Sequence, residues 1–408
     1  MENAHVLLAR QPIFNRKLNV VAYELLFRAG TENRADFVDG DQATSQVLLN
    51  AFTELDITDV VGKNKAFINF TRNLILTPQP FDKKHFVIEV LEGLKVDAEL
   101  IEGIKKLKEK GYVVALDDFV LQEENQVLLD YADIVKIDVL NFSESELEEI
   151  VQKLAKYPIK ILAEKVENHK MFNFCAKLGC QLFQGYFLSK PQIIKGKRVP
   201  ESKRSVVALI AKVNNPHVEV SELNALISKD PVLSYKLIRL INSASFGPSR
   251  EIDSIQRAIT LLGLDQLKSW ATLLSLSKLD DKPQELFIST MIRARMCETI
   301  GEKLKDDCQA AHHYTVGLLS NLAAFIDQLL SDIIPALCLS PPINDALLEY
   351  KGNLGKVLQV VMHFERAEWD EIDWNWLDSE GLKEEDVEIA YLNAIAWANE
   401  TKDSILVQ

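Results

Sequence analysis

The chain lacks any apolar run of the roughly 18 residues that a membrane-spanning helix needs. Its start, MENAHVLLARQPIF, also lacks a basic stretch followed by an apolar core, so we expect no export signal. The five cysteines have no paired spacing, which argues against a disulfide framework and against a zinc site of the C-x₂-C type. We therefore expect a cytoplasmic protein that does not bind a membrane.

Basic residues are fewer than acidic residues in this chain. The 408 residues include 46 Lys and Arg against 60 Asp and Glu, which gives a net charge of −14 at pH 7. Proteins that bind nucleic-acid polymers usually carry excess basic residues on one face, so this balance argues against that class. It still allows a small anionic ligand in an acidic pocket that cations neutralise. The length and the 47% hydrophobic content favour two or three domains.

Residues 1–194 alternate between short β-rich runs and amphipathic helical stretches, which is typical of an α/β fold with mostly parallel strands. The candidate strands are Val6–Gln11, Val20–Phe27, Lys65–Asn69, Phe86–Val90, Val113–Leu116, Ile134–Ile137, Ile159–Ala163 and Gln181–Phe183. The candidate helices are Ala43–Thr53, Ala98–Lys110 with an acidic start at Asp97, Ser145–Lys156 and Lys170–Leu178. A closed βα barrel explains this rhythm better than an open sheet, although periodicity alone does not separate the two.

Polar side chains stand at or just past the ends of these strands. Four of them offer the oxygen ligands that suit Mg²⁺ or Mn²⁺: Glu24, Asn69, Glu89 and Asp117. Because the carboxyl ends of parallel barrel strands meet at one mouth, we expect these groups to lie together. Asp118 and Glu164 would complete a second metal position or activate water, which Lys136 would orient. Each residue alone is also explained by ordinary solvation of a strand end, so the prediction depends on their convergence.

An ordered series of short motifs in this half resembles the EAL domain, the cyclic di-GMP phosphodiesterase module of bacterial signalling. The matching segments are Gln11–Ile13, Tyr23–Arg28, Phe67–Phe70, Glu89–Glu92, Asp117–Phe119, Lys136–Asp138, Ala163–Glu167 and Gln184–Tyr186. Leu25 stands where the family signature has alanine. The resemblance implies a TIM-like barrel and a two-metal site that hydrolyses cyclic di-GMP to linear pGpG.

The same resemblance implies a role for each matching residue. The implied metal ligands are Glu24, Asn69, Glu89 and Asp117, with Asp118 shared by the second metal. The implied catalytic residues are Glu164 as the base and Lys136 as its helper. The implied contacts to the nucleotide are Gln11, Arg28 and Gln184. The implied cofactor is Mg²⁺ or Mn²⁺.

The chain departs from the family pattern in three places. Active members carry a Gly- and Ser-rich loop after the Asp-Asp-Phe motif, whereas residues 120–125 contain no glycine. Glycine adopts backbone conformations closed to other residues, so we expect this loop to fold differently and Glu92 to lose its usual partner. Lys165 replaces the glycine next to the implied base, where it would shift Glu164 by charge or point to solvent. The intervals from Glu24 to Asn69 and from Asn69 to Glu89 are also shorter than usual.

The second half has a different pattern. Residues 195–204, KGKRVPESKR, form the predicted linker. Residues 205–408 repeat apolar positions at three- and four-residue intervals, which predicts an all-helical domain, and Asp230 with Pro231 predicts a helix start. The segments Ser228–Ser234, Leu240–Ala244 and Ser254–Gly263 resemble the HDOD domain, a relative of the HD metal hydrolases that mostly lacks their metal site. Ser320 and Asn321 stand where the hydrolase pattern has His and Asp, so we expect no hydrolysis here.

Three interpretations follow from these patterns. In the first, the barrel binds a divalent metal and cyclic di-GMP, and the helical domain signals through protein contacts. In the second, the barrel is an active phosphodiesterase regulated by the helical domain. In the third, the whole chain is a catalytically dead scaffold. The retained ligands favour the first two, whereas the loop without glycine favours the first and third. Turnover, the pathway, the protein partners and the formation of a homodimer stay open.

Overall fold

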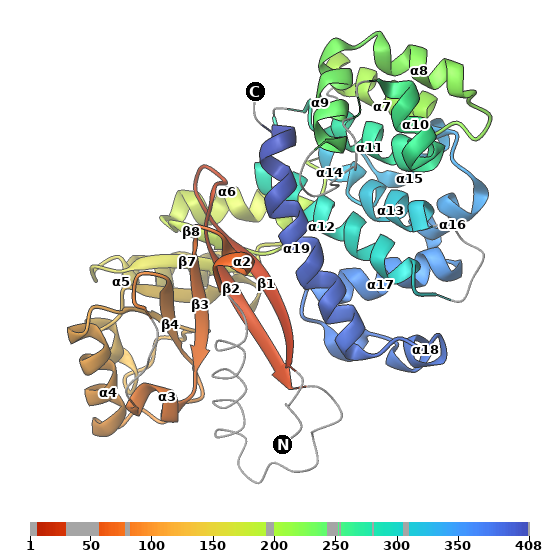
Figure 1. Cartoon of the computed structure of the whole chain (residues 1–408). Helices are drawn as coiled ribbons and strands as arrows, with labels where there is room; N and C mark the ends of the chain where they lie inside the picture. The colour runs from red at the N-terminus through yellow and green to blue at the C-terminus, as the bar shows by residue number, and fades with distance from the viewer. Residues whose placement is uncertain are drawn as a thin grey trace. The chain divides into compact units, whose positions relative to one another are not determined.

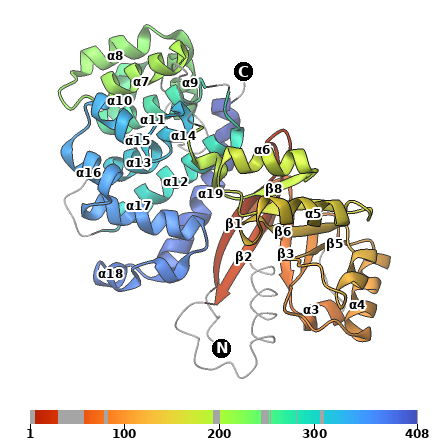
Figure 2. The same ribbon diagram turned by 180° about the vertical axis from the view of Figure 1, so that it is seen from behind.

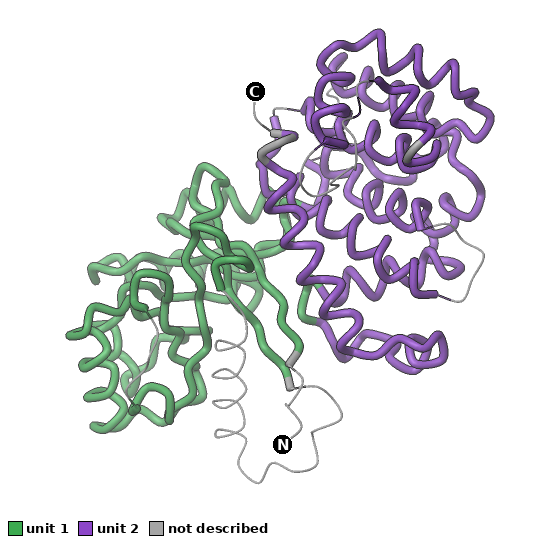
Figure 3. The backbone as a smooth tube through the Cα atoms, in the orientation of Figure 1, with its two compact units in different colours: residues 1–188, 365–367 green, residues 189–364, 368–408 purple. Residues whose placement is uncertain are grey.

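The computed structural model describes residues 6–29, 57–77, 82–192, 200–242, 252, 254–279, 281–304 and 310–406. The chain forms two compact units, one of residues 1–188 with 365–367 and one of residues 189–364 with 368–408 (Figure 3). The predicted helix Ala43–Thr53, residues 195–199 of the predicted linker and residues 243–244 of the segment Leu240–Ala244 lie outside the described residues.

The first unit is an eight-stranded barrel that closes in chain order (Figures 1 and 2). Its strands are β1 (Val6–Asn15), β2 (Val20–Ala29), β3 (Lys65–Phe70), β4 (Phe86–Val90), β5 (Val113–Leu116), β6 (Ile134–Asp138), β7 (Lys160–Glu164) and β8 (Leu182–Gln184). Strands β2 to β8 pair in parallel, whereas β1 is antiparallel to both β2 and β8. The turn between β1 and β2 is too short for a parallel crossover, so these strands form a hairpin. The predicted TIM-like barrel is confirmed, with one reversed strand.

Short helices connect the strands. They are α2 (Ile57–Val61), α3 (Arg72–Leu76), α4 (Ala98–Glu109), α5 (Glu144–Leu154) and α6 (His169–Leu178), with 3-10 turns η2 (Gln126–Asp130), η3 (Val139–Asn141) and η4 (Tyr186–Ser189). Helix α4 begins at its predicted cap, because the Asp97 carboxylate accepts a hydrogen bond of 3.0 Å from the Leu100 amide. Ser143 and Glu146 form a capping box at the start of α5. The three longer helices confirm the sequence predictions.

The barrel interior is built in layers. One buried apolar residue from each strand joins a continuous cluster: Ile13, Ala22, Phe67, Val87, Ala115, Ile134, Leu162 and Leu182. Side chains two positions apart on a strand point to the same face, so the residue two positions nearer the mouth also points inward. On the reversed β1 and then on β2 to β8 in order, those residues are Gln11, Glu24, Asn69, Glu89, Asp117, Lys136, Glu164 and Gln184. A layer of polar side chains therefore lies next to the apolar cluster, on the side of the barrel mouth.

The second unit is helical throughout its described residues (Figure 1). Its helices are α7 (Glu201–Val213), α8 (Val220–Ser228), α9 (Pro231–Ile241), α10 (Ile255–Leu262), α11 (Leu264–Leu276), α12 (Gln284–Gly301), α13 (Ala310–Leu319), α14 (Leu322–Ile326), α15 (Leu330–Ile333), α16 (Pro341–Glu349), α17 (Gly352–Glu365), α18 (Trp374–Ser379) and α19 (Glu384–Leu406), with η5 (Ile334–Leu337) and η6 (Trp369–Glu371). Helix α12 packs against α13 and α19. The Asp230 carboxylate caps α9 as predicted, with Pro231 in its first turn.

Among the described residues, no single helix is long and apolar enough to cross a membrane. The helical segments Ala310–Ile326 and Leu330–Leu337 pass by length and composition only when they are taken together across a bend of 102°. Most side chains of α13, which lies within the first of these segments, are buried in the second unit.

Candidate functional site

The polar layer of the barrel is centred on one lysine. Lys136 ends in an ammonium group that is 1% exposed and contacts four carboxylates from four different strand ends. The distances from Lys136 Nζ are 2.6 Å to Glu89 Oε1, 2.7 Å to Asp117 Oδ1, 2.9 Å to Glu164 Oε1 and 3.2 Å to Glu24 Oε1. The sequence-predicted acids of the second, fourth, fifth and seventh strands therefore converge on one point.

Burial sets the protonation of this cluster. It raises the pKa of Glu89 well above its usual range, and the nearby negative charge of Glu24 adds to that shift. Burial likewise raises the pKa of Asp117, and it raises the pKa of Glu164 to about 8. Burial also disfavours the charged form of Lys136, but the surrounding carboxylates outweigh it, and the pKa of Lys136 lies well above its usual value. With one ammonium among four acids, the cluster carries carboxylate groups that a further cation would neutralise.

The oxygen atoms of this layer fit a divalent metal ion. Glu24, Glu89 and Asp117 each offer an oxygen atom, and these atoms all lie within 4.8 Å of one another. Asn69 is the register partner of Glu89 on the neighbouring strand. Asn69 Oδ1 and Glu89 Oε2 are buried and accept no hydrogen bond from any residue in the described ranges. Buried acceptors without donors are costly, and a hard cation such as Mg²⁺ or Mn²⁺ would satisfy them.

The three residues expected to contact a nucleotide divide into a pair and a separate arginine. Gln184 Nε2 donates to Gln11 Oε1 at 3.0 Å and also to Glu24 Oε2, which fixes the Glu24 carboxylate. Gln11 Nε2 donates to the Tyr186 hydroxyl at 3.1 Å. Arg28 is half-buried on β2, four residues beyond Glu24 on the same strand face. At about 3.3 Å per residue, Arg28 lies about 13 Å further along that strand.

Asp118 and Asp138 form a second, smaller acidic group with Lys165. Lys165 Nζ lies 2.6 Å from Asp138 Oδ2, and its backbone adopts the left-handed φ of 53° that suits the glycine it replaces. The Lys165 side chain is half exposed, but its ammonium is bound to Asp138, a role that neither expectation for this lysine included. Burial raises the pKa of Asp118, and the positive charge of Lys165 opposes that shift.

Asp138 is the site residue to which the sequence patterns assigned no role. It is 5% exposed, and it is the register partner of Glu164 across β6 and β7. It stands two positions beyond Lys136 on the same strand, so the alternation that places Lys136 inside the barrel also indicates Asp138. That signal was available in the sequence.

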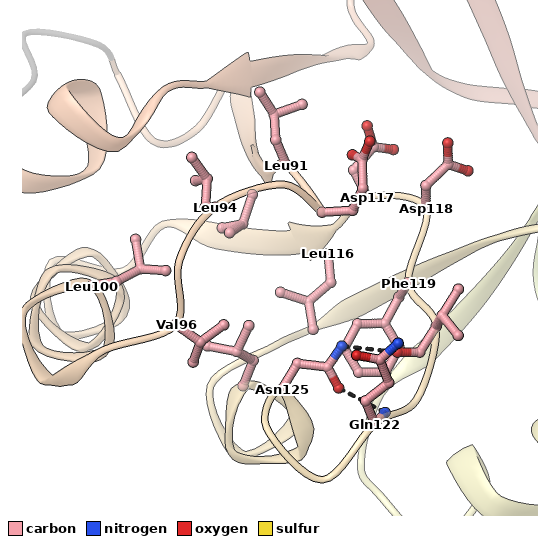
Figure 4. Close-up of a pocket in the computed structure, with 14 residues that line it drawn as sticks. Leu91, Leu94, Val96, Leu100, Leu116, Asp117, Asp118, Phe119, Gln122 and Asn125 are labelled. Atoms are coloured by element: carbon pink, nitrogen blue, oxygen red, sulfur yellow. Dashed lines mark hydrogen bonds between the residues drawn. The ribbon is translucent and has the colours of Figure 1, made fainter. Parts of the chain in front are cut away.

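The loop of residues 120–125 closes on itself without glycine. Asn125 Oδ1 accepts a hydrogen bond of 2.9 Å from the Gln122 amide, and Asn125 Nδ2 donates to the Val120 carbonyl at 2.8 Å (Figure 4). Glu92 is exposed, and no described residue forms a hydrogen bond or ion pair with it. The pocket beside this loop has a mainly apolar lining that comes largely from the connection between β4 and α4, from the end of β5 and from Phe119. The carboxylates of Asp117 and Asp118 point away from that lining (Figure 4).

The helical unit holds an arginine at the position where the hydrolase pattern has its metal-binding pair. Arg293 Nη1 donates to Asn321 Oδ1 at 2.8 Å and to Ser320 Oγ at 3.1 Å. Asn321 Nδ2 donates to Thr290 Oγ1 at 2.9 Å. His313 is buried and packs against Gly301, where an added Cβ would meet its ring at 2.4 Å. A guanidinium at this position is incompatible with a cation bound by the same side chains.

Comparisons with known proteins agree with both halves. Residues 42–191 match the EAL domain and residues 199–338 match the HDOD domain. The uncharacterized protein YuxH of Bacillus subtilis is 35% identical over 98% of this chain and 99% of that protein. The cyclic di-GMP phosphodiesterase CdgJ of Vibrio cholerae is 32% identical over 96% of this chain and 92% of that protein. A Klebsiella pneumoniae structure, BlrP1 in complex with manganese and cyclic di-GMP, is 20% identical, covers 46% of this chain and 56% of that chain, and has a TM-score of 0.38.

A closed barrel with an acidic mouth that matches the EAL domain, followed in the chain by a helical unit that matches the HDOD domain, defines a two-domain signalling protein. The chain belongs to the family in which an EAL domain is followed by an HDOD domain.

Proposed function

We propose that the protein acts in cyclic di-GMP signalling by binding a divalent metal ion and, through it, cyclic di-GMP at the mouth of the barrel. The observation that carries this proposal is the excess of buried carboxylates around Lys136, which one ammonium does not neutralise. The similarity to CdgJ, a cyclic di-GMP phosphodiesterase, supports the choice of ligand.

The chain has groups that suit the metal ion and the phosphates of this ligand. Glu24, Asn69, Glu89 and Asp117 would hold Mg²⁺ or Mn²⁺, which when bound supplies positive charge to a phosphate oxygen and activates water. Arg28 offers the paired hydrogen bonds that suit a phosphate. Gln11 and Gln184 offer amide groups for the nucleotide, and Gln184 also holds Glu24 in place.

The helical unit is the proposed output. Arg293 binds Ser320 and Asn321, so this unit would act through protein contacts rather than hydrolysis. The cysteines that the structure describes form no disulfide, which fits the reducing cytoplasm: Cys175, Cys180, Cys297 and Cys338. We propose a cytoplasmic protein with no membrane or nucleic-acid polymer as its partner.

A second candidate function is hydrolysis of cyclic di-GMP to pGpG. The observation that favours it is Glu164, whose pKa is raised by burial to about 8, close to the value that suits a general base at neutral pH. Lys136 Nζ lies 2.9 Å from Glu164 Oε1 and would stabilise its charged form. In this function Glu164 would accept a proton from water, and Lys136 would keep the carboxylate in position.

Calorimetry and chromatography on the full chain test both functions. Cyclic di-GMP is titrated into the wild type with and without Mn²⁺, and the same mixtures are analysed for pGpG. Metal-dependent heat that disappears in Glu24→Gln but persists in Glu109→Gln, an exposed acid of α4, is expected. The absence of binding in the wild type with Mn²⁺ contradicts the proposal. Formation of pGpG that stops in Glu164→Gln establishes hydrolysis.

A further inference from the structure

Two groups of charged side chains lie at the barrel mouth, and they differ in net charge. Around Lys136, four carboxylates face one ammonium, which leaves three negative charges in excess when all are ionised. In the second group, Asp138 binds the ammonium of Lys165 and Asp118 lies within reach of its charge, which leaves one negative charge in excess when both acids are ionised. A divalent cation neutralises the first group without reversing its charge, whereas it would make the second group positive.

The Lys165 ammonium is bound to one carboxylate of the second group. Its Nζ is 2.6 Å from Asp138 Oδ2, and Asp138 is 5% exposed. Its φ of 53° lies in the left-handed region that a residue with a Cβ rarely adopts. Bonding to Asp138 raises the pKa of Lys165, with the charge of Asp118 adding to it, so the ammonium stays charged across the physiological range.

The two carboxylates of the second group differ in their hydrogen-bond partners. Asp118 Oδ1 is buried and accepts no hydrogen bond from any residue that the structure describes. Asp138 Oδ2, by contrast, is taken by Lys165. An incoming metal ion would gain one free oxygen from Asp118 but would have to displace an ammonium to reach Asp138, against the repulsion of like charges.

We propose that the Lys165 ammonium is the built-in cation of the second group and limits the barrel mouth to one divalent metal ion. The inference rests on the proposed function for the first metal position. Two-metal sites stabilise the attacking and leaving oxygens together, so a mouth with one metal ion would retain ligand binding without the stabilisation that the second ion supplies. Lys165 is thus a positioning residue that sets metal stoichiometry and favours binding over turnover.

Metal stoichiometry tests the inference without any measurement of activity. Mn²⁺ alone is titrated into the full-length wild type, Lys165→Met and Lys165→Gly, and free Mn²⁺ is followed by electron paramagnetic resonance. Methionine keeps the length of the side chain and removes its charge, whereas glycine also relieves the left-handed backbone. Lys170→Met, which alters an exposed lysine of α6, is the matched control.

The wild type and Lys170→Met are expected to bind one Mn²⁺ each. Both Lys165 variants are expected to bind a second Mn²⁺. Their affinity for this second ion should exceed any affinity of the wild type for a second ion by at least tenfold. The second ion should couple magnetically to the first, since paired metals lie about 3.5–4 Å apart. Two equivalent ions in the wild type, or one ion in both Lys165 variants, overturns the inference and leaves the proposed function intact. No Mn²⁺ in any of the chains overturns both.

Discussion

Replacement of Lys136 by methionine removes the one ammonium buried among four carboxylates. Methionine has a similar length, so the change deletes charge with little change in volume. Loss of one partner from a buried ion pair typically costs about 3–5 kcal/mol, because the remaining charge is left uncompensated. Here the acids take up protons instead, which limits the cost. We therefore expect Lys136→Met to lose about 3–5 kcal/mol of barrel stability at pH 8.5 without metal and less at pH 5.5.

The direction of this pH effect follows from proton linkage. Removing the ammonium raises the pKa values of carboxyls that are already raised by burial, so the folded barrel binds more protons than the unfolded chain. Stability is then greatest below the unfolded pKa of about 4.3 and falls as the pH rises through the folded values. Mn²⁺ at 100 times its dissociation constant should restore about 2.7 kcal/mol by binding only the folded state.

The distribution of tryptophan supplies the assay. All five tryptophans, Trp270, Trp369, Trp374, Trp376 and Trp397, lie in the helical unit, and none lies in the barrel. Tryptophan fluorescence during urea unfolding therefore reports the helical unit, whereas far-ultraviolet circular dichroism reports both units. Lys136→Met should lower the barrel transition in circular dichroism and leave the fluorescence transition in place. Unchanged stability of Lys136→Met at pH 8.5 without metal would refute the reasoning about Lys136. An equal shift of both transitions would show that the loss of stability is not confined to the barrel.

The remaining predictions concern the same layer. Glu89→Gln should lower Mn²⁺ affinity at least tenfold but should destabilise the metal-free barrel little, because burial raises the pKa of Glu89 and so already disfavours its charged form. Calorimetry and urea unfolding check both parts, and unchanged affinity excludes Glu89 as a ligand. Wild-type Mn²⁺ affinity should rise from pH 6 to pH 9, because burial raises the pKa of Glu164 to about 8 and the loss of its proton adds negative charge beside the metal ligands. An affinity that does not change with pH contradicts this reasoning. Gly185→Ala should destabilise the barrel by about 2 kcal/mol or more. The φ of Gly185 is 139°, and an added Cβ would lie 2.3 Å from the Val166 carbonyl oxygen. A melting temperature equal to that of the wild type would show that the backbone can move to accept the Cβ.

Much of the site is predictable from the sequence because strand alternation is strict. An apolar residue followed two positions later by a polar one occurs on each of the seven parallel strands, whose predicted ends lie within two residues of the observed ones. The first strand differs, because it was predicted to end at Gln11 and extends to Asn15. The reversal of β1 also follows from the short turn before Val20. Those features need only local information.

The pairing of charges was not predictable in the same way. That Lys136 contacts four acids depends on the closure of the barrel, which brings β2 and β6 within reach across its interior. That Lys165 binds Asp138 depends on a left-handed backbone at Lys165, which a residue with a Cβ rarely adopts. Sequence patterns place these groups at the mouth but do not say which ammonium serves which carboxylate.

The layered interior also explains how this chain tolerates short connections. Each polar residue of the site lies two positions from the buried apolar residue of its own strand. The spacing within each strand therefore places the site, and the number of residues between strands does not. Loops and outer helices can be trimmed without moving any member of the site. A single residue inserted between Phe67 and Asn69, by contrast, would turn the amide to the outside of the barrel and remove it from the mouth. We expect homologues to vary freely in the lengths of their connections and hardly at all in the spacing within each strand.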